Sequence, residues 1–202
     1  MAIGKLYEAP KTPFTPVLNA GLEWPALPQA TRDAFKGPGA KVKLAAGFRL
    51  YKFTQGDIES AWGVTPWWSP TKGYQWDAGL QARLDLARNL GVSPVELTRI
   101  VAAVRSHWNK LDFILTSVLI KEVYAFWGMA GWQPREGDDT IEQLNEIDAL
   151  VEKETGKKPM RRGLTGSASQ FFIPNLKRGE HIRRGLRVPV ADVIEGKVQI
   201  YG

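Results

Sequence analysis

The sequence of 202 residues contains no cysteine, and its only histidines are His107 and His181. Without cysteine the chain can form neither a disulfide nor a thiolate metal site, and it has no thiol nucleophile. A zinc centre built from several histidines and cysteines is excluded as well, so we expect no metal site. His107 falls in a predicted helix and His181 in a basic loop, which favours surface positions over catalytic roles for both rings.

Long apolar runs are also scarce. Residues 1–8 lead directly into proline-rich sequence without the apolar core of a secretory signal, which predicts a cytoplasmic protein unless a specialised secretion system exports it. The most apolar run, residues 113–132, carries Lys121 and Glu122 at its middle, where each charge costs roughly 2.5–3.5 kcal/mol on insertion into a bilayer. We therefore expect one or two buried strands there, or a buried helix, and no contact with membranes.

Hydrophobic residues make up 44% of the chain, which is enough for the core of one domain of this length. The net charge is +6, and basic residues gather in the last third of the sequence. They are Lys157, Lys158, Arg161, Arg162, Lys177, Arg178, Arg183, Arg184 and Arg187. This basic set would bind a phosphate-bearing ligand or a nucleic acid, or it would form an ordinary solvated face.

Residues 1–40 hold six prolines, at positions 10, 13, 16, 25, 28 and 38. Proline interrupts long helices and central strands, so this segment is predicted to be an extended arm. Its aromatic and aliphatic residues, including Tyr7, Phe14 and Trp24, predict that the arm packs on the domain. Residues 41–202 would then form a single domain.

Periodicity predicts an α+β fold, with a small mixed or antiparallel sheet and a helical segment of about three helices over residues 76–155. Residues 41–54 alternate as a strand, with Phe48, Leu50 and Lys52 on one side and Arg49, Tyr51 and Phe53 on the other. Further strands are predicted at residues 170–173, 186–190 and 197–201. Residues 62–76 form a loop rich in tryptophan that would line a site or fill the core.

The helix signals are local and complete. Residues 78–89 carry a stripe of Leu80, Leu84 and Ala87 that Gly91 ends, and Ser93 and Pro94 begin a second helix that runs to Lys110. Glu96 would close a capping box on Ser93. A third helix starts at Asp139 or Thr140 and ends near Glu154, with Ile141, Leu144, Ile147 and Val151 facing inward.

Two short segments resemble strands of the ADP-ribosyltransferases and related NAD-glycohydrolase toxins. Residues 48–53, Phe-Arg-Leu-Tyr-Lys-Phe, resemble the first core strand of that family, in which an apolar-Tyr-Arg pattern presents a cation to the dinucleotide. Residues 167–174, Ser-Ala-Ser-Gln-Phe-Phe-Ile-Pro, look like its late strand, in which a catalytic glutamate is followed by three apolar residues and a proline. Gln170 occupies the position of that glutamate.

The resemblance implies that NAD is a substrate rather than a bound cofactor. Gln170 would be the catalytic residue, and either Arg49 or Lys52 would bind the diphosphate. The remaining substrate-binding residues would be Trp67, Trp68, Ser69, Thr71 and Phe171. The amide of Gln170 cannot act as a base toward an acceptor, as the carboxylate of a glutamate can. Hydrolysis of NAD is therefore at least as well supported as ADP-ribosyl transfer.

The resulting hypothesis is a bacterial effector or toxin that consumes NAD and meets an immunity protein, or a protein or nucleic-acid target. The alternative is a non-catalytic accessory protein of a phage or secretion system, which holds its partner through the tryptophan-rich loop and the basic set. A third reading is nucleic-acid binding by charge alone, which predicts an affinity that falls steeply with salt.

Overall fold

The fold is that of a computed structural model, which describes residues 17–55, 64–106, 108–134, 141–157 and 163–200. Its main sheet has seven strands in the order β1-β5-β8-β3-β2-β4-β9, and every pair in it is antiparallel. These strands are β1 (Ala40–Leu44), β2 (Arg49–Thr54), β3 (Trp67–Pro70), β4 (Phe113–Leu119), β5 (Val123–Met129), β8 (Ser169–Phe172) and β9 (Ile182–Pro189). Strands β6 (Gln133–Pro134) and β7 (Gly163–Leu164) form a separate pair.

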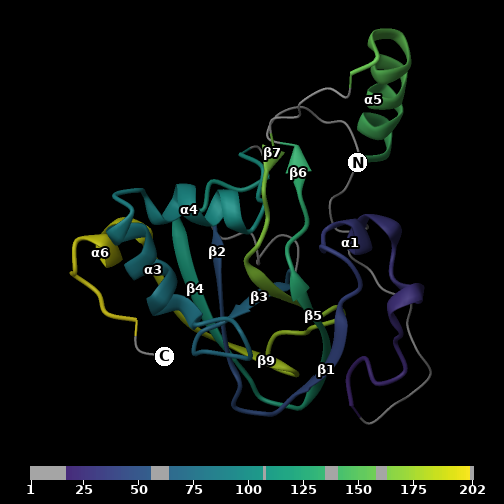
Figure 1. The fold of residues 1–202 in the computed structure, drawn as a ribbon. Helices are drawn as coiled ribbons and strands as arrows, with labels where there is room; N and C mark the ends of the chain where they lie inside the picture. Colours follow the sequence, from purple (N-terminus) through teal and green to yellow (C-terminus); the bar gives the residue numbers. More distant parts are fainter. Residues whose placement is uncertain (1–16, 56–63, 107, 135–140, 158–162, 201–202) are drawn as a thin grey trace.

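Helices lie beside both ends of this sheet (Figure 1). They are η2 (Trp24–Ala26), α1 (Gln29–Asp33), α3 (Gly79–Asn89), α4 (Pro94–Val101), α5 (Ile141–Thr155) and α6 (Val190–Ile194). Figure 1 shows α3, α4 and α6 near β4 and β9, α1 on the side of β1, and α5 away from the sheet. The prediction of an α+β fold with an antiparallel sheet is confirmed.

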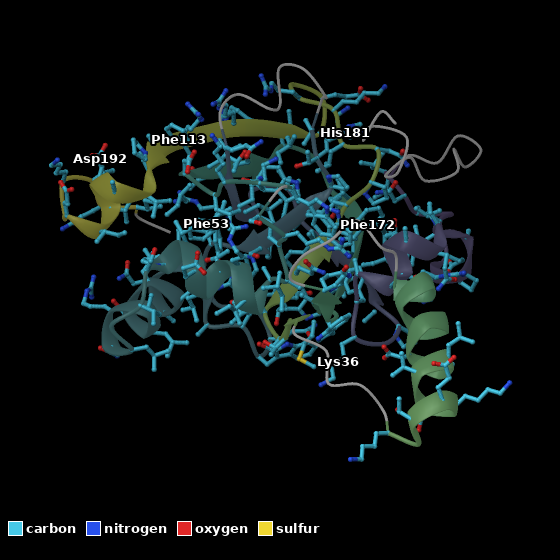
Figure 2. All side chains as sticks on the ribbon, turned by 90° about the horizontal axis from the view of Figure 1, so that it is seen from above. Lys36, Phe53, Phe113, Phe172, His181 and Asp192 are labelled. Atoms are coloured by element: carbon cyan, nitrogen blue, oxygen red, sulfur yellow. The ribbon has the colours of Figure 1, made fainter. Side chains whose placement is uncertain are left out.

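The core occupies both faces of the sheet, because successive side chains of a strand point to opposite faces. Leu50 of β2 packs in one cluster with Trp68 and Phe171. Tyr51 and Phe53 pack on the other face, in a cluster that includes Leu80 and Leu84 of α3. This confirms the alternation predicted for residues 48–53, and Figure 2 shows Phe53 on the side of the helices. The single strand predicted over residues 41–54 is wrong, however, because β1 ends at Leu44, β2 begins at Arg49, and three other strands lie between them in the sheet.

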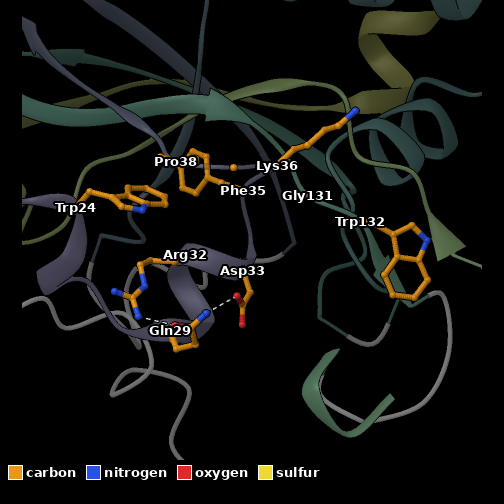
Figure 3. A pocket seen from close by; sticks show the side chains of 10 residues that line it. Trp24, Gln29, Arg32, Asp33, Phe35, Lys36, Pro38, Gly131 and Trp132 are labelled. Carbon is orange, nitrogen blue, oxygen red and sulfur yellow. Dashed lines mark hydrogen bonds between the residues drawn. The ribbon is translucent and has the colours of Figure 1, made fainter. Parts of the chain in front are cut away.

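The described part of the proline-rich arm, from Val17 onwards, packs on the sheet as predicted. Leu22, Leu27 and Phe35 are buried in a third cluster with Phe126 and Phe172. The segment is not extended throughout, since it contains η2 and α1. Together with Gly131 and Trp132, it lines a hollow of about 560 Å³ (Figure 3).

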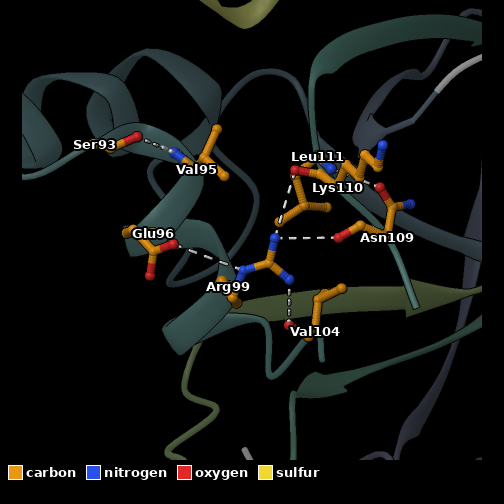
Figure 4. A network of polar contacts seen from close by, with 8 residues as sticks. All are labelled: Ser93, Val95, Glu96, Arg99, Val104, Asn109, Lys110 and Leu111. Carbon is orange, nitrogen blue, oxygen red and sulfur yellow. Dashed lines mark hydrogen bonds and ion pairs between the residues drawn. The ribbon is translucent and has the colours of Figure 1, made fainter. Parts of the chain in front are cut away.

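The local signals for α3 and α4 are borne out. Gly91 has a φ of +64°, and the Ser93 hydroxyl accepts a hydrogen bond from the amide of Val95 at 3.2 Å. The second helix is shorter than predicted, however, because α4 ends at Val101 rather than at Lys110. The Arg99 guanidinium donates to the carbonyl groups of residues 104, 109 and 110, which follow the helix (Figure 4). The predicted capping box is the exception: the Ser93 hydroxyl bonds to Val95 rather than to Glu96, and the Glu96 carboxylate forms an ion pair with Arg99 at 3.9 Å.

Because the Ser93 side chain caps the N-terminus of α4, Ser93→Ala should lower the free energy of unfolding by about 1 kcal/mol. The amide of Val95 would lose its side-chain acceptor, while Ser93→Asp would keep one. Denaturant unfolding monitored by circular dichroism measures the difference. Ser106→Ala, at an exposed serine beyond the end of α4, is the control and should leave stability unchanged.

Several predicted elements differ from the structure. The segment 76–155 contains the three helices but also β4, β5 and β6, so it is not purely helical. The strands predicted in residues 113–132 are confirmed as β4 and β5, and the alternative of a buried helix is wrong. The tryptophan-rich stretch is not an irregular loop, because β3 lies in the middle of the sheet. Residues 197–200 form no strand; Val198 and Ile200 instead pack against the cluster of Tyr51. For α5, the candidate caps Asp139 and Thr140 lie outside the described residues, and the structure describes only the backbone of Ile141, Leu144 and Ile147. The predicted end near Glu154 is confirmed, since α5 ends at Thr155.

Candidate functional site

The three segments singled out in the sequence become neighbours in the sheet, where β3 lies between β2 and β8. Trp67 and Trp68 pair with Phe172 and Phe171 of β8. The second half of β3, beginning at Ser69, pairs with β2 instead. β3 therefore stops pairing with β8 at Ser69. We call the place where these two strands separate the fork, and it consists of Ser69, Ser169 and Gln170.

The fork holds two half-buried polar side chains on adjacent strands. The Ser69 hydroxyl lies 3.5 Å from the carbonyl oxygen of Ser169. Gln170 donates from Nε2 to the carbonyl oxygen of Ala34 at 3.0 Å. This bond orients the amide, because only its nitrogen can donate. No described residue donates to Oε1 of Gln170, so that oxygen remains an acceptor at the fork.

The strand register also places the two candidate cations. Ser69 lies opposite Tyr51, and side chains two residues apart on a strand share a face. Arg49, which is exposed, is therefore on the face of Ser69, whereas Lys52 is on the opposite face. Lys52 donates to the Thr65 hydroxyl at 2.7 Å, and its ammonium lies 4.3 Å from the centre of the Trp68 ring.

The aromatic residues predicted to bind the substrate are also divided between the two faces of the sheet. Trp67 is half-buried and packs against Phe172 and Phe35, with ring centres 4.8 and 5.4 Å apart. Trp68 and Phe171 lie in the core on the far side of the sheet. They present no free ring face, so among these three aromatic residues only Trp67 is placed beside the fork.

Thr71 has a structural position. Its amide donates to the carbonyl of Arg49 at 3.0 Å, and its carbonyl accepts from the amide of Leu80 at 3.0 Å. The residue is buried and joins the end of β3 to the first turn of α3. Of the predicted substrate-binding and catalytic residues, the structure thus brings Arg49, Trp67, Ser69 and Gln170 to one face, and places Lys52, Trp68 and Phe171 on the other.

A buried polar cluster beside the fork was not anticipated from the sequence. Tyr51, opposite Ser69, lies beneath α3 with the Arg83 guanidinium 5.7 Å from its ring centre. Arg83 pairs with Asp77 at 3.5 Å, and these side chains are only 10% and 7% exposed. Burial raises the pKa of Tyr51 to about 12 although Arg83 opposes the shift, so the phenol stays neutral. Ion pairs along a helix join residues three or four positions apart, whereas Asp77 and Arg83 are six positions apart. The sequence pattern therefore did not predict this pair.

His181 is not the surface residue that the sequence suggested, since it is only 8% exposed. Its Nδ1 accepts a hydrogen bond from the amide of Lys177 at 3.2 Å. Burial lowers the pKa of its imidazole, with Lys121 and Lys177 acting in the same direction and Glu180 against it. The ring thus has a structural role, while His107 lies outside the described residues.

This depressed pKa predicts a pH-dependent stability. The unfolded chain, with an imidazole pKa of 6.5, takes up the proton before the folded chain does. The contribution of His181 is therefore complete above pH 6.5 and is lost as the pH falls from there through the lower folded-state pKa. His181→Gln, which keeps an acceptor for Lys177, should lose less unfolding free energy between about pH 7.5 and about pH 5.5. Equal losses in denaturant titrations of the two proteins would contradict this.

The basic set is only partly described. Arg183, Arg184 and Arg187 lie on β9, the last strand of the sheet, and the Arg187 guanidinium lies 3.6 Å from the centre of the Phe113 ring. Lys158, Arg161 and Arg162 lie outside the described residues. The described members of the basic set therefore do not form one patch around the fork.

In the described ranges, no three His, Asp or Glu side chains gather as metal ligands would. None of the helices there is long and apolar enough to cross a membrane. No protein-family model, curated protein or solved structure matches the chain. The fork is therefore the candidate site on the strength of its own geometry.

Proposed function

We propose that the protein consumes NAD at the fork, by hydrolysis or by ADP-ribosyl transfer, as a bacterial effector or toxin would. One observation carries the proposal. The segments that resemble NAD-consuming toxins are about 120 residues apart in sequence, yet they lie in strands separated only by β3. Gln170 and Arg49 then share a face with Ser69, which supports a common role for the three.

Cleavage of NAD requires few protein side chains. When the bond between nicotinamide and the ribose carbon breaks, its electron pair leaves with nicotinamide and positive charge develops on the ribose. Oε1 of Gln170, the free acceptor at the fork, would take a hydrogen bond from a ribose hydroxyl and stabilise that charge. The exposed Arg49 guanidinium would bind the diphosphate through paired hydrogen bonds.

Water or an acceptor group then attacks the ribose carbon, forms the new bond to it and releases a proton to solvent. A glutamine amide does not take up protons near neutral pH, so Gln170 would not activate an acceptor as a carboxylate does. This favours water as the acceptor and hydrolysis as the reaction. Ser69, 3.5 Å from the Ser169 carbonyl, would help to place the ribose.

The test is to incubate the purified full-length chain with NAD and to follow release of nicotinamide and ADP-ribose by chromatography. Arg49→Ala should mainly raise KM, because the diphosphate is bound in the ground state, while Arg88→Ala at an exposed arginine of α3 is the control. No release by a folded protein would reject the proposal. It would favour the alternative of a non-catalytic accessory protein that holds a partner through the tryptophan-rich segment. That alternative is supported by Trp76, whose indole is 62% exposed and packs on Trp127.

A further inference from the structure

A row of three residues crosses three neighbouring strands on the face of the fork. In the register of the sheet, Arg49 of β2 lies opposite Val118 of β4. Val118 in turn lies opposite Arg183 of β9, on the other side of β4. Directly opposite residues of paired strands direct their side chains to the same face of the sheet. Arg183 therefore shares with Arg49 the face that carries the fork.

The packing of β9 agrees with this placement of Arg183. The preceding residue, Ile182, is buried in the core cluster of Trp68 on the opposite face of the sheet. Because successive side chains of a strand alternate, Arg183 points away from that cluster and Arg184 points back toward its side. The register shift between β4 and β9 begins only beyond Ser117, so it does not disturb the row.

The two arginines of the row are exposed, while Val118 between them is half-buried. Within the ranges that the structure describes, neither guanidinium has an ion pair or a hydrogen-bond partner. Adjacent strands are about 4.8 Å apart, so the Cα atoms of Arg49 and Arg183 lie about 10 Å apart across β4. From that distance two long side chains can converge above Val118, and each guanidinium can bind one phosphate group through paired hydrogen bonds.

We infer that Arg49 and Arg183 together bind one diphosphate group, which makes Arg183 a second substrate-binding cation. The inference deepens the proposed function and rests on it for the choice of NAD as the ligand. The planar guanidinium matches two oxygens of a phosphate, and two such groups match a diphosphate. A diphosphate between the arginines would also offset the repulsion of two like charges on one face. Free pyrophosphate carries the same group as a dinucleotide and is the other source of the ligand.

Isothermal titration calorimetry of the full chain with ADP-ribose and with inorganic pyrophosphate tests the inference without any cleavage of NAD. Arg183→Ala and Arg49→Ala should each weaken binding of both probes roughly tenfold, because each removes charge-assisted hydrogen bonds. Arg184→Ala is the matched control, since it removes the same charge at the next residue of β9 but on the opposite face. It should change the affinities less than about threefold, because a charge that does not touch the ligand is screened by salt. Unchanged circular dichroism spectra would show that the variants are folded.

Three results would overturn the inference: no binding of either probe at about 1 mM, unchanged binding in Arg183→Ala, or equal weakening by Arg183→Ala and Arg184→Ala. If both arginines are needed, tighter binding of ADP-ribose than of pyrophosphate would identify a dinucleotide as the source of the diphosphate. Equal affinities would identify free pyrophosphate.

The same variants separate this inference from the proposed function. Binding that depends on both arginines, in a chain that releases no nicotinamide, would uphold the diphosphate site and reject cleavage of NAD. Nicotinamide release with an unchanged KM in Arg183→Ala would reject the role of Arg183 and leave cleavage of NAD in place.

Discussion

Gln170→Ala should lower the rate of nicotinamide release from NAD by roughly 10²-fold, the loss typical of removing one positioned group that stabilises transition-state charge. The substitution deletes the acceptor Oε1 at the fork and the donor that binds the Ala34 carbonyl. Loss of the second bond should lower the free energy of unfolding by only about 1 kcal/mol, so the variant should remain folded. Single-turnover and steady-state assays of the purified variant measure the effect.

Two further variants separate chemistry from structure. Gln170→Glu keeps an acceptor oxygen, but its ionised carboxylate would face the Ala34 carbonyl without a proton to donate. It should therefore recover part of the activity, and more of it at low pH, where the carboxyl is protonated. Gln81→Ala, at an exposed glutamine of α3, should turn over NAD normally. Nicotinamide release from Gln170→Ala at the normal rate would rule out the assignment of Gln170.

Asp77→Ala should lower the free energy of unfolding by about 3–5 kcal/mol, because it leaves the Arg83 cation buried without its partner. The Asp77 carboxylate also accepts from the amide of Gly79 at 2.7 Å, so the first turn of α3 would lose a hydrogen bond. Tyr51 lies under the same helix. Urea denaturation of the variant measures the loss of stability.

The double variant Asp77→Ala with Arg83→Met removes both charges and should recover much of this stability, since an apolar pair of similar volume needs no solvation. Asp85→Ala breaks an exposed pair with Arg88 instead and should cost less than about 1 kcal/mol. Equal costs for Asp77→Ala and Asp85→Ala would show that burial of the Asp77–Arg83 pair is not what stabilises α3.

The sequence by itself determined the features that depend on neighbours along the chain. The start of α4 at Ser93 and Pro94, the end of α3 before Gly91 and the alternation of β2 were all predicted correctly. Each follows from backbone geometry or from a hydrogen bond between residues two to four positions apart. Periodicity likewise sufficed for the α+β class, and composition for the packing of the described part of the arm.

Only the tertiary structure decided which distant residues meet. Residues 67–70 of the tryptophan-rich segment became a central strand because β8 pairs with the first half of β3 and β2 with the second half. The helix α4 ends at Val101, and the Arg99 side chain binds carbonyl groups of the residues that follow it. His181 is buried although its sequence neighbours are charged. The choice between Arg49 and Lys52, and the meeting of Gln170 with Ser69, depend on register across three strands. Such register is set by long-range pairing, which leaves no periodic trace in a single sequence.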